Sequence, residues 1–260
     1  MVSLFLNKVV IVTGASSGIG AASALEFAKN GAKLVLAARN VERLNEVANQ
    51  CSSKGLQQEN IFVKGCDITI EDNLKSLVAS TLEKYGQIDV LVNNAGSGQY
   101  LDFMNTTPEV FDNTFNINTR APFLLTQMCI PHLKKTQGCV VNVSSILGQR
   151  SLPIALTYCM SKAALDHFTR TLALELAKDK VRINSVNPGV VITEFQTRAG
   201  MNDEVYKQFL KSQGEHQPLT GVIEPTEVAK VILFLASDQA SSITGELLFV
   251  DGGRHAKAPA

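Results

Sequence analysis

Short apolar segments alternate with longer amphipathic segments along most of the chain. The short segments are rich in Val and Ile at consecutive positions, which is typical of strands buried on both faces of a sheet. The longer segments carry apolar residues at helical spacing, and two begin at Thr107-Pro108 and Glu224-Pro225. The pattern predicts strands over 8–13, 33–38, 61–64, 88–93, 138–144, 182–187 and 247–250, and helices over 18–30, 41–53, 71–85, 108–135, 157–178 and 225–236.

This alternation predicts an α/β fold for residues 1–260 as a single domain. Parallel strands need long crossover connections, which are right-handed and helical here, so helices should cover both faces of the sheet. The expected architecture is a Rossmann-type, doubly wound, seven-stranded parallel sheet. The stretch 189–220 shows neither the apolar runs of a buried strand nor the apolar spacing of a helix. We expect it to form a substrate loop that acts as a lid.

Composition excludes several classes of protein. The 24 basic and 24 acidic residues cancel, which argues against a nucleic-acid partner. The five cysteines are scattered and form no Cys-x-x-Cys, so we expect neither a disulfide framework nor a metal site. No apolar run approaches the roughly 18–20 residues of a membrane span, and the first residues do not resemble a signal peptide. We therefore expect a cytoplasmic protein with no membrane partner.

A glycine-rich segment, Thr13-Gly14-Ala15-Ser16-Ser17-Gly18-Ile19-Gly20, follows the first predicted strand and opens the first helix. Glycines allow the tight turn and a close approach of the backbone to a ligand, and the amino end of a helix attracts a pyrophosphate. In this strand-to-helix context the pattern predicts a dinucleotide site. The expected cofactor contacts in this segment are Gly14, Ser16, Ser17, Gly18, Ile19 and Gly20.

The end of the second strand, Leu36-Ala37-Ala38-Arg39-Asn40, indicates which dinucleotide binds. It lacks the acidic residue that commonly binds the ribose 2′-hydroxyl of NAD. Arg39 lies beside that position, and a guanidinium can bind a 2′-phosphate through two hydrogen bonds. We therefore expect Arg39 and Asn40 to contact the cofactor and NADP(H) to be preferred over NAD(H). The alternative for Arg39 is a solvated charge at a helix start.

Two further segments end at the carboxyl edge of the predicted sheet, where open α/β sheets bind ligands. Asp67 and Ile68 follow the third strand, and Asp67 either accepts a hydrogen bond from the adenine amino group or caps a helix. Asn94, Ala95 and Gly96 follow the fourth strand, and the small residues leave room for a ribose. All five are expected cofactor contacts.

Tyr158 and Lys162 are four residues apart on one predicted helix, so both side chains can reach the same bound molecule. Reduction of a carbonyl group requires a proton donor, and a nearby ammonium lowers the pKa of a phenol from its usual value of about 10. Lys162 can also hold the ribose of the nicotinamide. Ser145 ends the preceding strand, and its hydroxyl can bind the substrate oxygen. These three residues form a predicted catalytic group.

Together these motifs resemble the short-chain dehydrogenase/reductase family. The resemblance runs from the glycine segment through Asn93-Asn94-Ala95-Gly96, Ser145, Tyr158-x-x-x-Lys162 and Asn187-Pro188-Gly189 to Val250-Asp251-Gly252-Gly253. The glycine spacing and the length resemble the compact branch of the family, which includes 3-oxoacyl-(acyl-carrier-protein) reductases and steroid and carbonyl reductases. The resemblance implies NAD(P)-dependent transfer of a hydride between nicotinamide and a carbonyl/alcohol pair.

The same resemblance implies further roles. Asn118 would be a fourth catalytic residue that supports a water-linked proton relay to Lys162. Pro188 and Gly189 would begin a loop over the nicotinamide, with the Ile192 backbone and the Thr193 hydroxyl contacting the cofactor. Relatives with this carboxyl-terminal pattern are commonly tetramers, so a homotetramer is implied, with a homodimer as the alternative.

The walls expected around the substrate are apolar. Ser145, Tyr158, Leu147, Leu152 and Phe195 are the predicted substrate contacts, whereas Met201, Tyr206 and Phe209 line either the substrate or the core of a lid helix. We expect a lipophilic ketone, steroid-like or ecdysteroid-like, that is reduced to a secondary alcohol. The alternatives are a 3-oxoacyl thioester reductase and a catalytically silent NADP(H)-binding module.

Overall fold

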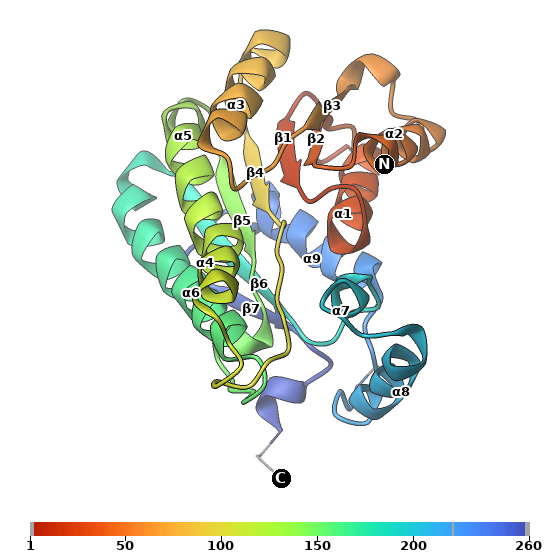
Figure 1. The fold of residues 1–260 in the computed structure, drawn as a ribbon. Coiled ribbons are helices and arrows are strands. Elements are labelled where there is room, and N and C mark those ends of the chain that lie inside the picture. Colours follow the sequence, from red (N-terminus) through yellow and green to blue (C-terminus); the bar gives the residue numbers. More distant parts are fainter. Residues whose placement is uncertain (1–2, 220, 258–260) are drawn as a thin grey trace.

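A parallel β-sheet runs through the middle of the protein (Figure 1). The computed structural model describes residues 3–219 and 221–257. The strand order is β3-β2-β1-β4-β5-β6-β7, and every neighbouring pair is parallel. The bounds are β1 Val9–Thr13, β2 Lys33–Ala38, β3 Ile61–Gly65, β4 Val90–Asn93, β5 Cys139–Val143, β6 Arg182–Pro188 and β7 Leu247–Val250.

Helices cover both faces of this sheet (Figure 1). One face carries α1 (Gly18–Lys29), α2 (Val41–Ser53) and α9 (Pro225–Ala236), and the other carries α3 (Glu71–Tyr85), α5 (Ala121–Thr136) and α6 (Leu156–Leu176). Within the described ranges, no helix is long and apolar enough to cross a membrane.

The buried strands explain the two layers. Along β1, Val10 and Val12 pack under α1 and α9, whereas Val9 and Ile11 pack under α3 and α5. Because successive side chains of a strand point to opposite faces, a continuous apolar run supplies a core on each side. The predicted doubly wound parallel sheet is confirmed.

The structure corrects two of the expected elements. The helix expected over 108–135 is interrupted: α4 (Pro108–Phe115) passes into a π-helical turn, Asn116–Arg120, before α5 begins. One extra residue in a turn leaves the helical spacing of apolar residues nearly unchanged, so the pattern did not reveal it. The stretch 189–220, expected to be irregular, contains α7 (Phe195–Arg198) and α8 (Asp203–Gly214), and the side chain of Asn202 caps α8.

Candidate active site

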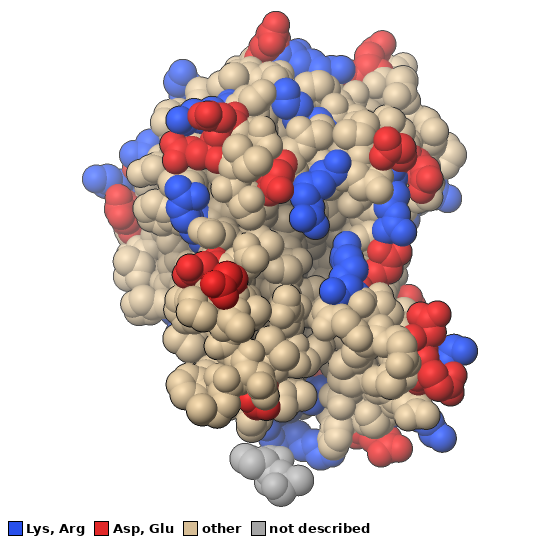
Figure 2. Space-filling model, viewed as in Figure 1, with Lys and Arg blue, Asp and Glu red and all other residues tan. Residues whose placement is uncertain are grey.

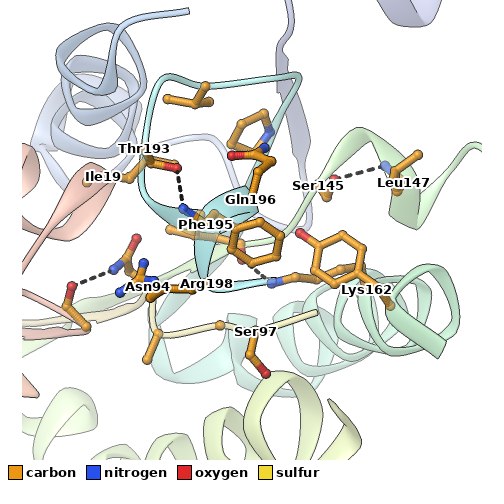
Figure 3. Close-up of a pocket in the computed structure, with 18 of the residues that line it drawn as sticks. Ile19, Asn94, Ser97, Ser145, Leu147, Lys162, Thr193, Phe195, Gln196 and Arg198 are labelled. Atoms are coloured by element: carbon orange, nitrogen blue, oxygen red, sulfur yellow. Dashed lines mark hydrogen bonds between the residues drawn. The ribbon is translucent and has the colours of Figure 1, made fainter. Parts of the chain in front are cut away.

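A cavity of about 830 Å³ opens at the carboxyl edge of the sheet, between the strand ends and the lid formed by α7 and α8. Its size is that of a site for a cofactor and a small molecule. All of the predicted contact residues line it except Gly20, Asn118 and Ile192. Figure 3 shows Asn94 and Arg198 on one side of this space and Ser145 and Lys162 on the other.

The glycine segment is shaped by the end of β4. Gly14 has a φ of +64°, and a Cβ at this position would lie 2.9 Å from the Cα of Ala95. Asn94 Nδ2 donates to the Thr13 carbonyl at 2.8 Å, and the Thr13 hydroxyl accepts from the Asn94 N–H at 3.0 Å. Asn94 therefore supports the glycine turn, and the narrow cradle that results fits a dinucleotide backbone.

Two predicted cofactor residues lie outside the cavity. A Cβ on Gly20 would come within 2.5 Å of Asn94 Nδ2, so this glycine lets α1 pack closely against the turn. The Ile192 N–H donates to the Ile223 carbonyl at 2.9 Å and is therefore engaged within the protein. Both residues shape the site, but neither lines it.

Three arginines gather at the end of the cavity next to β2. Arg39 lines this end from the end of β2, Arg43 from α2 and Arg198 from α7. Arg43 Nη1 lies 2.6 Å from Glu194 Oε2, and Arg198 Nη1 donates to the Ser17 hydroxyl at 3.3 Å. Burial lowers the pKa of Arg198, and the two other arginines add to the effect against the attraction of Glu194. This end of the cavity attracts anions.

Asp67 also lines this end and closes a turn. Its Oδ1 accepts hydrogen bonds from the N–H and the hydroxyl of Thr69, at 2.9 and 2.7 Å. The N-cap residue of α3 is Ile70, so the alternative prediction that Asp67 caps this helix is wrong. Asp67 stabilises the turn that leads into the helix.

The predicted catalytic side chains meet beside this cavity. Tyr158 and Lys162 lie one turn apart on α6, with the Lys162 ammonium 5.7 Å from the centre of the Tyr158 ring. Lys162 is buried and donates to the Val143 carbonyl at 2.8 Å. Ser145 caps a short 3-10 turn, Ile146–Gly148, by accepting from the Leu147 N–H at 3.1 Å. The end of β5 thus sets the position of Ser145.

Burial decides the protonation of this group. It raises the pKa of Tyr158 above its ordinary value, against a hydrogen bond with Ser145 that lowers it. It lowers the pKa of Lys162 to about 8, against the attraction of Asp166. The lowered pKa that the sequence predicts for Tyr158 is not found here, because desolvation outweighs the attraction of a phenolate to Lys162. The phenol is protonated at neutral pH.

Asn118 lies behind the cavity, in the π-helical turn. Its Oδ1 accepts from the Ser97 N–H at 2.9 Å, while its Nδ2 donates to the Ser97 carbonyl at 2.7 Å and to the Ser161 hydroxyl at 3.0 Å. Ser161 immediately precedes Lys162. The side chain of Asn118 thus joins the segment after β4 to α6, the helix that carries Tyr158 and Lys162.

The side of the cavity next to Tyr158 is apolar. Leu147, Leu152 and Phe195 line it, and the Phe195 ring centre lies 5.5 Å from that of Tyr158. Met201, Tyr206 and Phe209 were each expected either to line the substrate site or to form the core of a lid helix. Met201 and Phe209 line the cavity. Tyr206 does not, because its hydroxyl donates to the Thr193 carbonyl at 2.9 Å and fixes the lid.

Comparisons with known proteins agree with this arrangement. Residues 14–255 match the family profile described as enoyl-(acyl carrier protein) reductase. The 3-oxoacyl-(acyl-carrier-protein) reductase of Thermotoga maritima is 36% identical over 95% of this chain and 97% of its own. The chain belongs to the short-chain dehydrogenase/reductase family. It is therefore an enzyme of the oxidoreductase class.

Two further relatives span nearly the whole chain. The 7alpha-hydroxysteroid dehydrogenase of Paraclostridium sordellii is 34% identical over 97% of this chain and 94% of its own. A short-chain dehydrogenase/reductase of unknown function from Caenorhabditis elegans, solved with cofactor, superimposes with a TM-score of 0.93 at 36% identity. That match covers 98% of this chain and 97% of the relative.

The structure of this short-chain dehydrogenase/reductase also brings Asp166, which the sequence did not single out, next to the catalytic group. Its buried carboxylate accepts from Asn187 Nδ2 at 3.1 Å and from Gln149 Nε2 at 2.8 Å. Asn187 Nδ2 also donates to the Ser145 carbonyl at 3.0 Å. The one available signal was the position of Asp166 four residues after Lys162, on the same face of α6.

Gly98 and Gln196 are two further residues of the cavity region that were not singled out. A Cβ on Gly98 would lie 2.9 Å from Tyr158 Cδ2, so the absence of a side chain gives the Tyr158 ring its space. Gln196 is buried and lines the cavity, and its Oε1 has no hydrogen-bond partner within residues 3–219 and 221–257. Such an acceptor suits a ligand N–H or O–H.

Proposed function

We propose that this protein reduces a lipophilic ketone to a secondary alcohol with NADPH, using Asn118, Ser145, Tyr158 and Lys162. The observation that carries the proposal is the convergence of Ser145, Tyr158 and Lys162 beside a cavity that also contains the glycine cradle. A silent NADP(H)-binding module would not need this catalytic group.

In the proposed mechanism, the glycine cradle after β1 and the arginines next to β2 would hold NADPH, which when bound would supply a hydride for the carbonyl carbon. The Tyr158 hydroxyl donates its proton to the carbonyl oxygen, for which its raised pKa keeps it protonated. Ser145 donates a hydrogen bond to the same oxygen and positions it. The Lys162 ammonium stabilises the phenolate that forms, and Asn118 supports the water-linked relay through Lys162 that returns a proton to this phenolate.

The proposed preference for NADP(H) rests on the arginines. Arg39, Arg43 and Arg198 line the end of the cavity where the 2′-phosphate of the adenosine would be held, and one carboxylate, Glu194, is paired with Arg43. A guanidinium binds a phosphate more strongly than a neutral hydroxyl. NAD(H) would bind the same glycine cradle without this attraction.

The proposed substrate class rests on the walls near Tyr158. Leu147, Leu152 and Phe195 suit an extended apolar ketone, steroid-like or ecdysteroid-like. The similarity to a 7alpha-hydroxysteroid dehydrogenase supports this class. The similarity to a 3-oxoacyl-(acyl-carrier-protein) reductase favours the alternative, an acyl thioester.

We further propose a cytoplasmic homotetramer, with a homodimer as the alternative. Support comes from apolar side chains exposed on α5 and α6, among them Phe123 and Leu174. Exposed apolar surface of this kind marks an interaction site. The free cysteines, four of them buried, suit a reducing compartment.

Replacement of Tyr158 by Phe tests the function. The variant keeps the ring but loses the proton donor, so the rate of NADPH oxidation should fall by roughly 10²- to 10⁴-fold while NADPH still binds. The assay uses steroid ketones, 3-oxoacyl thioesters and small diketones, first with NADPH and then with NADH. Tyr85→Phe is the matched control, because Tyr85 lies outside the cavity and its hydroxyl donates to the Glu59 carbonyl.

Two outcomes would contradict the proposal. A wild-type protein that binds NADPH but reduces none of these ketones would favour the silent module. A Tyr158→Phe variant that retains more than about a tenth of the rate would remove Tyr158 from the mechanism.

A further inference from the structure

A second group of cations lies at the cavity, far from the arginines next to β2. Arg150 follows the 3-10 turn after β5, and Arg254 lies just beyond β7. Both are partly buried and line the cavity, as does the exposed Lys257. Figure 2 shows blue atoms gathered at the lower end of the molecule, where the C-terminal segment and α8 lie in Figure 1.

Neutral partners hold these two guanidinium groups in place. Arg150 Nη1 donates to the carbonyl of Arg254, which ties the segment after β5 to the segment after β7. Arg254 Nη1 donates to Gln213 Oε1 of α8 at 2.7 Å. The two arginines are therefore ordered by the strand ends and the lid rather than by acidic side chains.

No acidic residue in the described part of the chain forms a salt bridge with either arginine. Asp251 is near Arg254, but its carboxylate binds His255 Nδ1 at 2.9 Å and the N–H of Gly253 at 3.1 Å. Burial lowers the pKa of Arg254, and repulsion from Arg150 adds to this against the attraction of Asp251. Two like charges partly removed from water are costly unless an anion joins them.

Apolar residues adjoin this pair of cations. Leu147 lies three residues before Arg150, and Leu152 lies two after it. On α8, Phe209 lies one helical turn before Gln213, the residue that holds Arg254. The cavity therefore combines the Tyr158 hydroxyl, an apolar wall and a pair of unneutralised guanidinium groups.

We propose that the substrate is an elongated lipophilic ketone with an anionic group at the end away from the carbonyl. Arg150 and Arg254 bind that group while the ketone lies at Tyr158. A guanidinium pair binds a carboxylate, sulfate or phosphate through charge-assisted hydrogen bonds, with the apolar wall covering the carbon skeleton. This inference rests on the proposed ketone reduction and specifies its substrate class.

Matched pairs of substrates test the proposal. One pair is a 7-oxo bile acid with a free carboxylate and its methyl ester. The other is a 3-oxoacyl coenzyme A thioester and the uncharged N-acetylcysteamine thioester of the same chain. With saturating NADPH, kcat/KM for the charged member of at least one pair should exceed that of the uncharged member by roughly tenfold or more. The pair that shows the preference identifies the source of the anion.

Two variants then assign the preference to the arginines. In Arg150→Gln and Arg254→Gln, the ratio of charged to uncharged kcat/KM should fall toward one, mainly through KM of the charged substrate. Arg254→Lys keeps the positive charge and should restore part of the ratio. Lys178→Gln removes an exposed charge outside the cavity and should leave activity unchanged.

Several results would overturn the proposal. If the wild-type protein gives the same kcat/KM for the charged and the uncharged member of both pairs, the anionic group contributes nothing to substrate recognition. If the ratio of charged to uncharged kcat/KM persists in both Gln variants, the anionic group is recognised by residues other than Arg150 and Arg254. If no ketone is reduced, the proposed function fails, and calorimetric titration of the bile acid and its ester against the NADP⁺-loaded protein still decides the anion site. Equal binding of the two compounds would exclude it.

Discussion

Tyr158 and Lys162 show how one environment shifts two pKa values in opposite directions. Burial penalises the charged form, so the pKa of the phenol rises while that of the ammonium falls to about 8. A proton donor must hold its proton at the working pH, and a phenol with a raised pKa does so. The raised pKa therefore supports the proposed role of the Tyr158 hydroxyl as the proton donor.

At the same scale, Arg39→Asp should invert the cofactor preference. A carboxylate would repel the 2′-phosphate of NADPH and can accept hydrogen bonds from the ribose hydroxyl of NADH. We expect the kcat/KM ratio of NADPH to NADH to fall by roughly tenfold or more, measured with one ketone at fixed ionic strength. Lys54→Asp, which also replaces a cation by a carboxylate at an exposed position outside the cavity, is the control.

An unchanged ratio in Arg39→Asp would mean that Arg39 is a solvated charge. The preference, if present, would then depend on Arg43 and Arg198, which line the same end of the cavity.

At the scale of elements, the active site depends on contacts among β5, β6 and α6. Asp166 of α6 accepts from Asn187 of β6, and Asn187 also holds the backbone of Ser145 after β5. Gly148 allows this arrangement, because a Cβ there would overlap the carboxylate of Asp166. The buried polar contacts thus position the serine relative to the tyrosine on α6.

Asp166→Asn should weaken both stability and catalysis. Because Asn187 Nδ2 donates to both carboxylate oxygens, the new amide would place an N–H donor against it in either orientation, which costs about 1–3 kcal/mol for an unsatisfied buried group. For a chain of this size we expect Tm to fall by roughly 2–10 °C. The rate of ketone reduction should fall in kcat more than in KM, since Ser145 is displaced from the substrate oxygen.

The control for this substitution is Asp72→Asn, which changes an exposed carboxylate that pairs with Lys75 on α3. It should leave Tm and kcat unchanged. If Asp166→Asn behaves like this control in both measurements, the contacts around Asp166 do not support the site.

At the scale of the whole molecule, the face formed by α4, α5 and α6 carries apolar side chains that the described part of the chain leaves exposed. Phe123 of α5 is 47% exposed, and its ring lies 5.8 Å from that of Phe168 on α6. Leu174 on α6 is 81% exposed. Burial between copies of the chain would remove these side chains from water, which is favourable.

Phe123→Glu should therefore disrupt the oligomer. Light scattering after size exclusion should give the wild-type protein about four times the 28.1 kDa mass of one chain, and the variant a lower multiple. Phe103→Glu is the matched control, since Phe103 is 72% exposed but precedes α4. A wild-type protein of monomeric mass, or a variant that keeps the full mass, would refute the assembly.

The sequence by itself determined the elements and their chemistry. Consecutive apolar residues and helical spacing depend on neighbours along the chain, so the strands, the helices between them and the Gly14 turn could be predicted from the sequence. The alternation of strands and helices in turn predicted that the strands are parallel. The spacing of Tyr158 and Lys162 is likewise local. The π-helical turn around Asn118 and the helices of the lid were missed, because apolar periodicity does not register one extra residue or a short capped helix.

Only the tertiary structure decided how distant residues meet. The contact of Arg198 with Ser17 spans 181 positions, and that of Arg150 with Arg254 spans 104. It also decided the direction of the Tyr158 pKa shift, because desolvation depends on what surrounds a group in space. Spacing along the chain gives the kinds of chemical group at the site, whereas their partners and protonation follow from folding.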